Sequence, residues 1–234
     1  MEATILCIAS YEKGEQMARE LGELLHAEIE NDPLLGDAGT PLDPSVLLRA
    51  GSPGKTRVSV VNLVGLPDYG QKRRFVDQLA STLFSWIKKN PAPPAGLLGL
   101  LVIDEAKDFV PSGKSVPGKD NLLRLAAQAR KYGLGLLFAT QEPKSIDHKV
   151  VANCSTLLGG RMNSPASIGA LQQLLADKGA HVKDVAALKP GEFYFGSGAV
   201  KPYKIRTSLC LSAHPSTPPG EAQVLECARQ SMAS

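Results

Sequence analysis

The sequence predicts an α/β fold in which helices flank a mostly parallel β-sheet. Short apolar runs rich in β-formers alternate with amphipathic helical patterns along most of the 234 residues, as expected for parallel strands joined by helices. Two of the apolar runs end in polar side chains, and open α/β sheets bind their ligands at the carboxyl ends of strands. The composition, 43% hydrophobic and 21% charged, is that of an ordinary globular protein. A folded core of this class is therefore expected.

Periodicity and breaking residues place the elements along the chain. Asp120 or Asn121 is expected to cap one helix, and Gly133 to end it. Three parts follow: a helical and loop segment over 1–56, a core over 57–212, and a Pro-rich linker with a helix over 213–234. Helices are expected at 11–30, 69–89, 121–132, 146–153, 165–177 and 221–232, strands at 57–63, 97–103, 134–140, 156–162, 192–197 and 202–210, and loops at 31–56 and 109–119.

The apolar run 97–103 ends in two adjacent carboxylates, Asp104 and Glu105. A central strand that ends in this pair is typical of the Walker B segment of an ATPase. Asp104 would then hold Mg²⁺ beside the nucleotide phosphates, usually through water. Glu105 would orient and deprotonate the attacking water. The alternative is a strand that ends in a solvated acidic turn.

A second apolar run, from Leu134, ends in the polar pair Thr140 and Gln141. In RecA-like enzymes the strand beside Walker B ends in a polar sensor, which touches the γ-phosphate or the lytic water. Taken alone, the pair could simply cap the turn before Pro143. Two runs that end in Asp-Glu and Thr-Gln and are joined by one helix favour a nucleotide site, with Gln141 as the sensor and Thr140 beside the nucleotide.

A phosphate loop is missing from this pattern. The loop has the form GxxxxGK[ST] and stands between a strand and a helix. Gly54-Lys55-Thr56 is the only Gly-Lys-Thr in the chain, but position 49, where the first glycine belongs, is Arg49. No apolar strand precedes it, and a strand rather than a helix is expected after it, so we interpret it as a turn. The chain therefore carries residues for hydrolysis without those that grip the phosphates.

The collected segments resemble the HerA/FtsK superfamily of ring-forming motor ATPases, especially the bacterial HerA-like ATP-binding proteins. The resemblance extends from near residue 10 to near residue 215. It implies a RecA-like P-loop NTPase core of which this chain is the C-terminal part, either as a fragment or as a split protein. The stretches that carry it are Asn31–Pro44, Thr56–Leu63, Val102–Ala106, Ala127–Gly135, Ala139–Lys144 and Lys189–Phe195.

The resemblance also implies roles and partners. In these motors the segment Ala-Arg-Lys-Tyr-Gly supplies an arginine finger to the neighbouring subunit's nucleotide, and that role falls on Arg130. The alternative is an ordinary exposed helix arginine. Arg161 is a weaker candidate for the same interface. For this residue we prefer the alternative, an arginine at the end of a strand that pairs with a carboxylate. The implied cofactors are ATP and Mg²⁺. The implied partners are double-stranded DNA, a nuclease, and other subunits of the same kind. These subunits are expected to form a hexameric ring.

Other features of the sequence are less specific. The net charge of +3 does not by itself indicate nucleic acid, and the aromatic content of 5% argues against base-stacking platforms. Four scattered cysteines indicate reduced thiols of a cytoplasmic protein, and no apolar run is long enough to span a membrane. Loop lysines at 107, 114 and 119 could face DNA in a ring pore or simply solubilise the loop.

Two rival functions stay open. Without a phosphate loop, the chain could be a non-catalytic interaction module, inactive in isolation, that binds a partner or a neighbouring subunit. An unrelated α/β hydrolase or reductase, using Asp104 or Glu105 as acid or base, would need a further catalytic group. The sequence offers it neither a Gly-x-Gly-x-x-Gly motif nor a nucleophile elbow.

Overall fold

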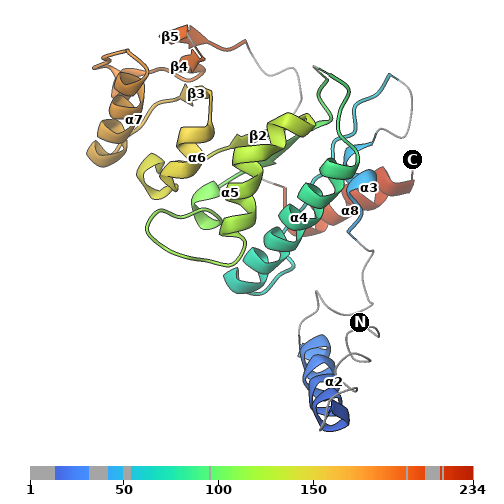
Figure 1. The fold of residues 1–234 in the computed structure, drawn as a ribbon. Coiled ribbons are helices and arrows are strands. Elements are labelled where there is room, and N and C mark those ends of the chain that lie inside the picture. Colours follow the sequence, from blue (N-terminus) through green and yellow to red (C-terminus); the bar gives the residue numbers. More distant parts are fainter. Residues whose placement is uncertain are drawn as a thin grey trace. The chain divides into compact units, whose positions relative to one another are not determined.

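The computed structural model describes residues 14–31, 42–49, 54–94, 96–198, 200–208, 217 and 219–233. The expected start of the first helix at 11–13, most of the expected loop 31–56 and the expected strand end at 209–210 lie outside these ranges. The chain divides into two compact units, residues 1–155 and 156–234. The predicted α/β class is confirmed, with a parallel strand pair in the first unit and an antiparallel sheet in the second (Figure 1). No helix in the described ranges is long and apolar enough to cross a bilayer.

The first unit is built around two parallel strands. In register, Gly99 lies opposite Leu134 and Ile103 opposite Phe138, so both strands end at the same edge. The helix predicted at 69–89 forms over these residues, because Asp68 caps it by accepting a hydrogen bond from the Gln71 N–H. The elements are α2 (Gly14–Asn31), α3 (Pro44–Leu48), α4 (Tyr69–Lys89), β1 (Gly99–Ile103), α5 (Lys119–Gln128), β2 (Leu134–Phe138) and α6 (His148–Asn153).

One face of this strand pair is buried and the other is open. Helices α4 and α5 contact each other and lie side by side in Figure 1, and their Ile87 and Leu125 share a core with Ile103 and Leu134. On the opposite face the side chains are 53%, 55% and 45% exposed at Leu100, Val102 and Leu137, respectively. Parallel sheets are normally covered on both faces. The described residues therefore supply only one covering layer.

The strand predicted at 57–63 does not form. The segment is coil and pairs with no strand in the described part, and Val58 and Val60 are 81% and 86% exposed. Its bonds go instead to α3, where the Ser59 hydroxyl donates to the Leu47 carbonyl over 2.9 Å. The prediction is wrong because β-branched residues favour a strand only when a neighbouring strand is present to pair with.

The cap predicted for α5 is also wrong. The helix begins at Lys119, and neither Asp120 nor Asn121 caps it. Gly118 occupies the cap position with a φ of 85°, a conformation that costs a glycine little. The Asn121 side chain donates instead to the Asp77 carboxylate of α4. The Asn121 side chain is therefore engaged in a contact between two helices and does not cap α5.

The loop 109–119 is tied down at its end by Lys119. Its ammonium donates to the carbonyls of Pro111 and Lys114 over 2.7 and 2.8 Å, and it pairs with Asp147 over 2.7 Å. This bond holds the pKa of the buried Asp147 carboxyl below its usual value, and Asp147 also caps α6. Lys119 is therefore a structural group, and the suggestion that it faces DNA is wrong.

The second unit packs a helix on an antiparallel sheet. The predicted hairpin is present, with β4 paired to β5 around Gly198, which has a φ of 56°. Strand β3 is antiparallel to β4, so the parallel part of the described fold is limited to β1 and β2. Asp184 accepts from Tyr194 and Lys204 and ties the sheet to the segment before it. The elements are β3 (Thr156–Gly159), α7 (Pro165–Asp177), β4 (Glu192–Ser197), β5 (Val200–Arg206) and α8 (Glu221–Ala233).

Candidate active site

The polar groups after β1 and β2 meet at the carboxyl edge of the sheet. Gln141 Nε2 donates to Glu105 Oε1 over 2.6 Å. Main-chain bonds hold the two strand exits together: the Ala139 N–H donates to the Ile103 carbonyl and the Ala106 N–H to the Ala139 carbonyl, each over 2.9 Å. Two segments 36 residues apart in the sequence therefore form one cluster.

Glu105 adopts a strained conformation at the centre of this cluster. Its φ of 45° and ψ of 46° are left-handed, and it is the one non-glycine residue with positive φ in the described part of the chain. This conformation costs an L-residue roughly 1–2 kcal/mol. Its Oε2 is buried without a hydrogen-bond partner, which is costly for a carboxylate oxygen. Strain and an unsatisfied polar atom at one residue are typical of functional sites.

Asp104 precedes it and is exposed. One carboxylate oxygen, Oδ1, accepts the Glu105 N–H over 2.9 Å, which leaves Oδ2 without a bond to the described protein. The described residues contain no group of three or more His, Cys, Asp or Glu side chains that could hold a metal. Mg²⁺ is commonly bound by only one or two carboxylates, completed by phosphate oxygens and water. Asp104 fits a ligand of that kind, and a metal cage made of protein alone does not fit.

The turn after β2 contains a second connection to the segment that follows β1. Lys107 Nζ donates to Glu142 Oε1 over 2.6 Å, and Ser145 Oγ donates to Glu142 Oε2 over 2.8 Å. The bond lowers the pKa of Glu142 and raises the pKa of Lys107. Thr140 Oγ1 accepts the Glu142 N–H over 3.1 Å, so its hydroxyl fixes the turn that presents Gln141. Sequence reasoning missed the ion pair, although two opposite charges adjoin the two motifs.

Arg130 lies at the other end of the sheet. It is exposed and belongs to a 3₁₀ turn, Ala129–Tyr132, which Gly133 ends directly before β2 begins. The five residues of β2 span about 16 Å, so Arg130 is separated from the carboxylates by the length of the strand. No hydrogen bond or ion pair between described residues joins it to Asp104 or Glu105. Arg161, which is exposed after β3, belongs to the second unit.

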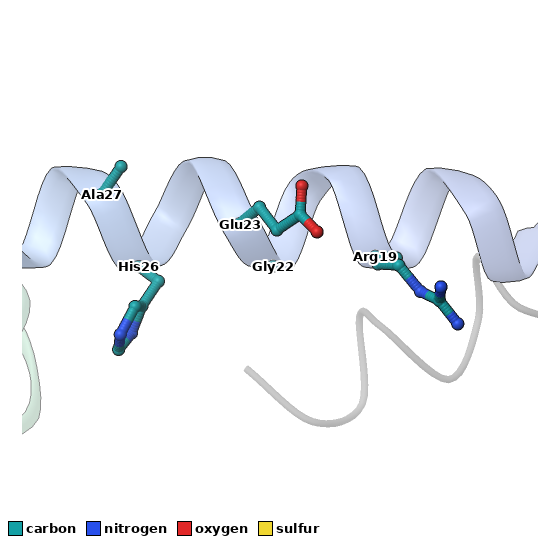
Figure 2. A pocket seen from close by; sticks show the side chains of 5 residues that line it. All are labelled: Arg19, Gly22, Glu23, His26 and Ala27. Carbon is teal, nitrogen blue, oxygen red and sulfur yellow. The ribbon is translucent and has the colours of Figure 1, made fainter.

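Two other places were candidates for ligand binding. Gly54 has a φ of 77°, and the residues after it are exposed coil rather than a helix, which confirms the interpretation as a turn. A shallow pocket on α2 is lined by residues of that helix alone: Arg19, Gly22, Glu23, His26 and Ala27. Their polar ends point in different directions and do not converge on one point (Figure 2). Neither place competes with the carboxyl edge of the strand pair.

Comparison with known proteins supports a relation to HerA-type helicases. The chain is 28% identical over 93 residues to a probable helicase of Methanocaldococcus jannaschii, which is 39% of this chain and 18% of that protein. It is 27% identical over 106 residues to the DNA double-strand break repair helicase HerA of Pyrococcus furiosus, which is 44% of this chain and 19% of that protein. These matches confirm the resemblance found in the sequence. No family model matches the chain.

Two further comparisons concern a phage protein and a viral packaging NTPase. Protein P9 of Pseudoalteromonas phage PM2 is 34% identical over 73 residues, or 31% of this chain and 32% of that protein. The genome packaging NTPase B204 of Sulfolobus turreted icosahedral virus 2, solved with sulfate, matches with a TM-score of 0.50 and 18% identity over 73% of this chain and 74% of that one. This likeness shows the fold alone. The matched regions cover about a fifth to a third of the curated relatives.

Proposed function

We propose that this chain is the C-terminal portion of a HerA-like motor ATPase, which in complete form couples ATP hydrolysis to DNA translocation or remodelling as an oligomeric ring. The observation that carries the proposal is the Glu105–Gln141 hydrogen bond between the exits of two neighbouring parallel strands. It joins a candidate base and a candidate sensor at the edge where α/β sheets bind ligands. The Glu105 Oε2 is buried without a hydrogen-bond partner, so it would accept from an attacking water once a shift on nucleotide binding exposes it.

Each residue has one task in this proposal. Asp104 holds Mg²⁺ beside the phosphates, with Thr140 nearby in the turn. Glu105 removes a proton from the attacking water at Oε2, and Gln141 orients the Glu105 carboxylate and reports the state of the γ-phosphate. Arg130 acts across a subunit interface on the neighbour's nucleotide, because the guanidinium stabilises charge on the transferring phosphoryl group. Arg161 is the second candidate for that interface.

The phosphate loop must come from residues other than those in this sequence. The open face of the strand pair supports this view, since Leu100, Val102 and Leu137 are about half exposed on a parallel sheet that normally has helices on both sides. A strand and helix bearing a phosphate loop would supply a missing layer and the missing phosphate contacts together. The nuclease partner and the hexameric state are implications of the family resemblance only.

The test uses the longest natural reading frame that contains this sequence. If it carries a phosphate loop, we expect Mg-ATP hydrolysis that double-stranded DNA stimulates. Glu105→Gln should abolish turnover while retaining nucleotide binding, and Asp104→Asn should raise the Mg²⁺ concentration needed for half-maximal turnover, because it removes a carboxylate ligand. Asp120→Asn, an exposed carboxylate change in the first turn of α5, is the matched control. Undiminished turnover in Glu105→Gln would refute the assignment.

The second candidate function is a non-catalytic interaction module. It is favoured by the lack of a phosphate loop among all 234 residues, because that loop supplies most of the main-chain donors and the lysine that hold the phosphates. The ATPase assay on the longest reading frame separates the two candidates, because only the motor ATPase is expected to turn over there. Calorimetry with Mg-ATP on this chain alone measures the nucleotide binding that is left without the phosphate loop. Both candidates expect weak or undetectable binding here. Robust turnover by this chain that Glu105→Gln abolishes would show that other residues grip the phosphates.

A further inference from the structure

The two strand exits are joined by two side-chain bridges of different kinds. In the first, Gln141 donates to Glu105 over 2.6 Å. In the second, Lys107 pairs with Glu142 over 2.6 Å. Each bridge starts just after β1 and ends just after β2, so the partners are near neighbours on both sides. The first belongs to the proposed catalytic set, whereas the second has no assigned role.

We propose that Lys107 and Glu142 are positioning residues that hold Gln141 against Glu105. The inference rests on the proposed function, in which Gln141 orients the catalytic carboxylate. Gln141 is exposed, so packing does not fix its direction. The next residue, Glu142, is fixed on both carboxylate oxygens by Lys107 and Ser145, and its N–H donates to Thr140. Residue 141 therefore stands between two anchored positions.

The pair also makes the two strand exits move together. Lys107 belongs to the 3₁₀ turn that begins directly after the strained Glu105, and Glu142 directly precedes the 3₁₀ turn Pro143–Ser145. A shift of Glu105 on nucleotide binding would carry Lys107 with it, and the ion pair would pass that shift to the turn that presents Gln141. An exposed ion pair contributes little to global stability. The role of this ion pair is to fix the position of one turn relative to the other.

The test follows the side-chain amide of Gln141 by nitrogen-15 NMR in the full chain, without nucleotide. Gln141→Leu identifies the signal by its loss, and Glu105→Ala gives its position when the bridge is broken. We expect Lys107→Met to move the signal more than halfway towards the Glu105→Ala position. Lys107→Arg should keep it near its original position, because a guanidinium can also reach the Glu142 carboxylate.

Three controls separate positioning from a general effect. Lys144→Met removes an equal charge from the turn after β2, at an exposed lysine, and should leave the signal unmoved. The exchanged pair, Lys107→Glu with Glu142→Lys, should restore most of the original position. Salt of about 1 M screens exposed charges, so it should move the signal in the wild type and have little effect in Lys107→Met. The urea midpoint of unfolding should be nearly the same in the wild type and in the variants of Lys107, Glu142 and Lys144.

A Gln141 signal unchanged in Lys107→Met would overturn the proposal, and so would equal shifts in Lys107→Met and Lys144→Met. The experiment needs no ATP hydrolysis, so its outcome is independent of the proposed function. Failure of the ATPase test leaves the NMR result intact as a property of the fold. Failure of the NMR test leaves the catalytic assignments of Glu105 and Gln141 standing.

Discussion

At the scale of single residues, Glu105 carries two unfavourable features together. Its backbone is left-handed and its Oε2 is buried without a partner. A residue selected for stability alone would be glycine, which adopts this conformation without a Cβ clash. The carboxylate is retained at an energetic cost, which is the trade expected where activity and stability compete.

Glu105→Gly should raise the free energy of unfolding by about 1 kcal/mol, the scale of the left-handed penalty for an L-residue. Urea denaturation at pH 7 measures the change. Glu105→Ala is the control, because it removes the unpaired carboxylate but keeps the Cβ and therefore the backbone strain. If the alanine variant is as stable as the glycine variant, the backbone conformation is not the source of the cost.

Asp147 provides a pH-dependent test at the same scale. Its pKa is lowered from 3.8 in the folded protein, chiefly by the bond from Lys119 and then by the Lys149 N–H. A lowered carboxyl pKa contributes stability that is complete above the ordinary value and is lost as the pH falls through the folded-state value. The contribution of Asp147 should therefore be present at neutral pH and fade below 3.8.

Asp147→Asn should accordingly lower the free energy of unfolding at pH 7 by about 2 kcal/mol, the scale for hydrogen bonds to a charged, buried group. The difference from wild type should shrink at about pH 3, where protonation of Asp147 begins to weaken the same pair. Urea denaturation at both pH values measures it, with the exposed Asp120→Asn as the control. An equal loss at both pH values would show that the carboxylate charge is not responsible.

At the scale of elements, local signals predicted those segments whose caps and periodicity agree with their tertiary contacts. Helix α7 forms over the expected residues 165–177, because Ser164 caps it and Pro165 starts it. The segment 57–63 failed because its β-rich pattern needs a partner strand that the described residues do not supply. The cap of α5 failed because Asn121 bonds to Asp77 of another helix. Contacts between elements cannot be deduced from a local pattern.

The exposure of 57–63 makes a prediction about the energetics of this element. Val60→Lys should change the free energy of unfolding by less than about 0.5 kcal/mol, as exposed substitutions do, since Val60 is 86% exposed. Leu125→Ala, in the buried core beneath the strand pair, should cost about 2–5 kcal/mol. Thermal or urea unfolding measures both. A large cost for Val60→Lys would mean that the segment is packed in solution.

At the scale of the whole molecule, the sequence could predict that Glu105 and Gln141 meet, because the ends of neighbouring parallel strands share one edge. It could not predict the Lys107–Glu142 bridge, since charges in loops after strands follow no period. Nor could it predict that Lys119 turns inward to Asp147. The position of Arg130 is a consequence of topology as well. It precedes β2, whereas the carboxylates follow β1, so it stands at the opposite end of the strand pair.

This separation decides how Arg130 can act. An extended arginine side chain is much shorter than the roughly 16 Å spanned by five strand residues. In its own subunit it therefore falls short of Glu105, and only a neighbouring subunit could bring it to a γ-phosphate. In a complete relative with a phosphate loop, Arg130→Ala should leave nucleotide binding nearly intact and lower hydrolysis about 10³-fold or more.

Mixing two inactive variants of that relative tests action across the interface. Arg130→Ala subunits keep Glu105, and Glu105→Gln subunits keep Arg130, so some interfaces of a mixed ring would hold one intact copy of each. We expect a steady-state ATPase assay to show turnover in the mixture that neither variant has alone, rising to a maximum near equal proportions. A mixture as inactive as its components would contradict the finger assignment. Arg130 would then be an ordinary exposed arginine at the C-terminal end of a helix, where the negative end of the helix dipole stabilises a cation.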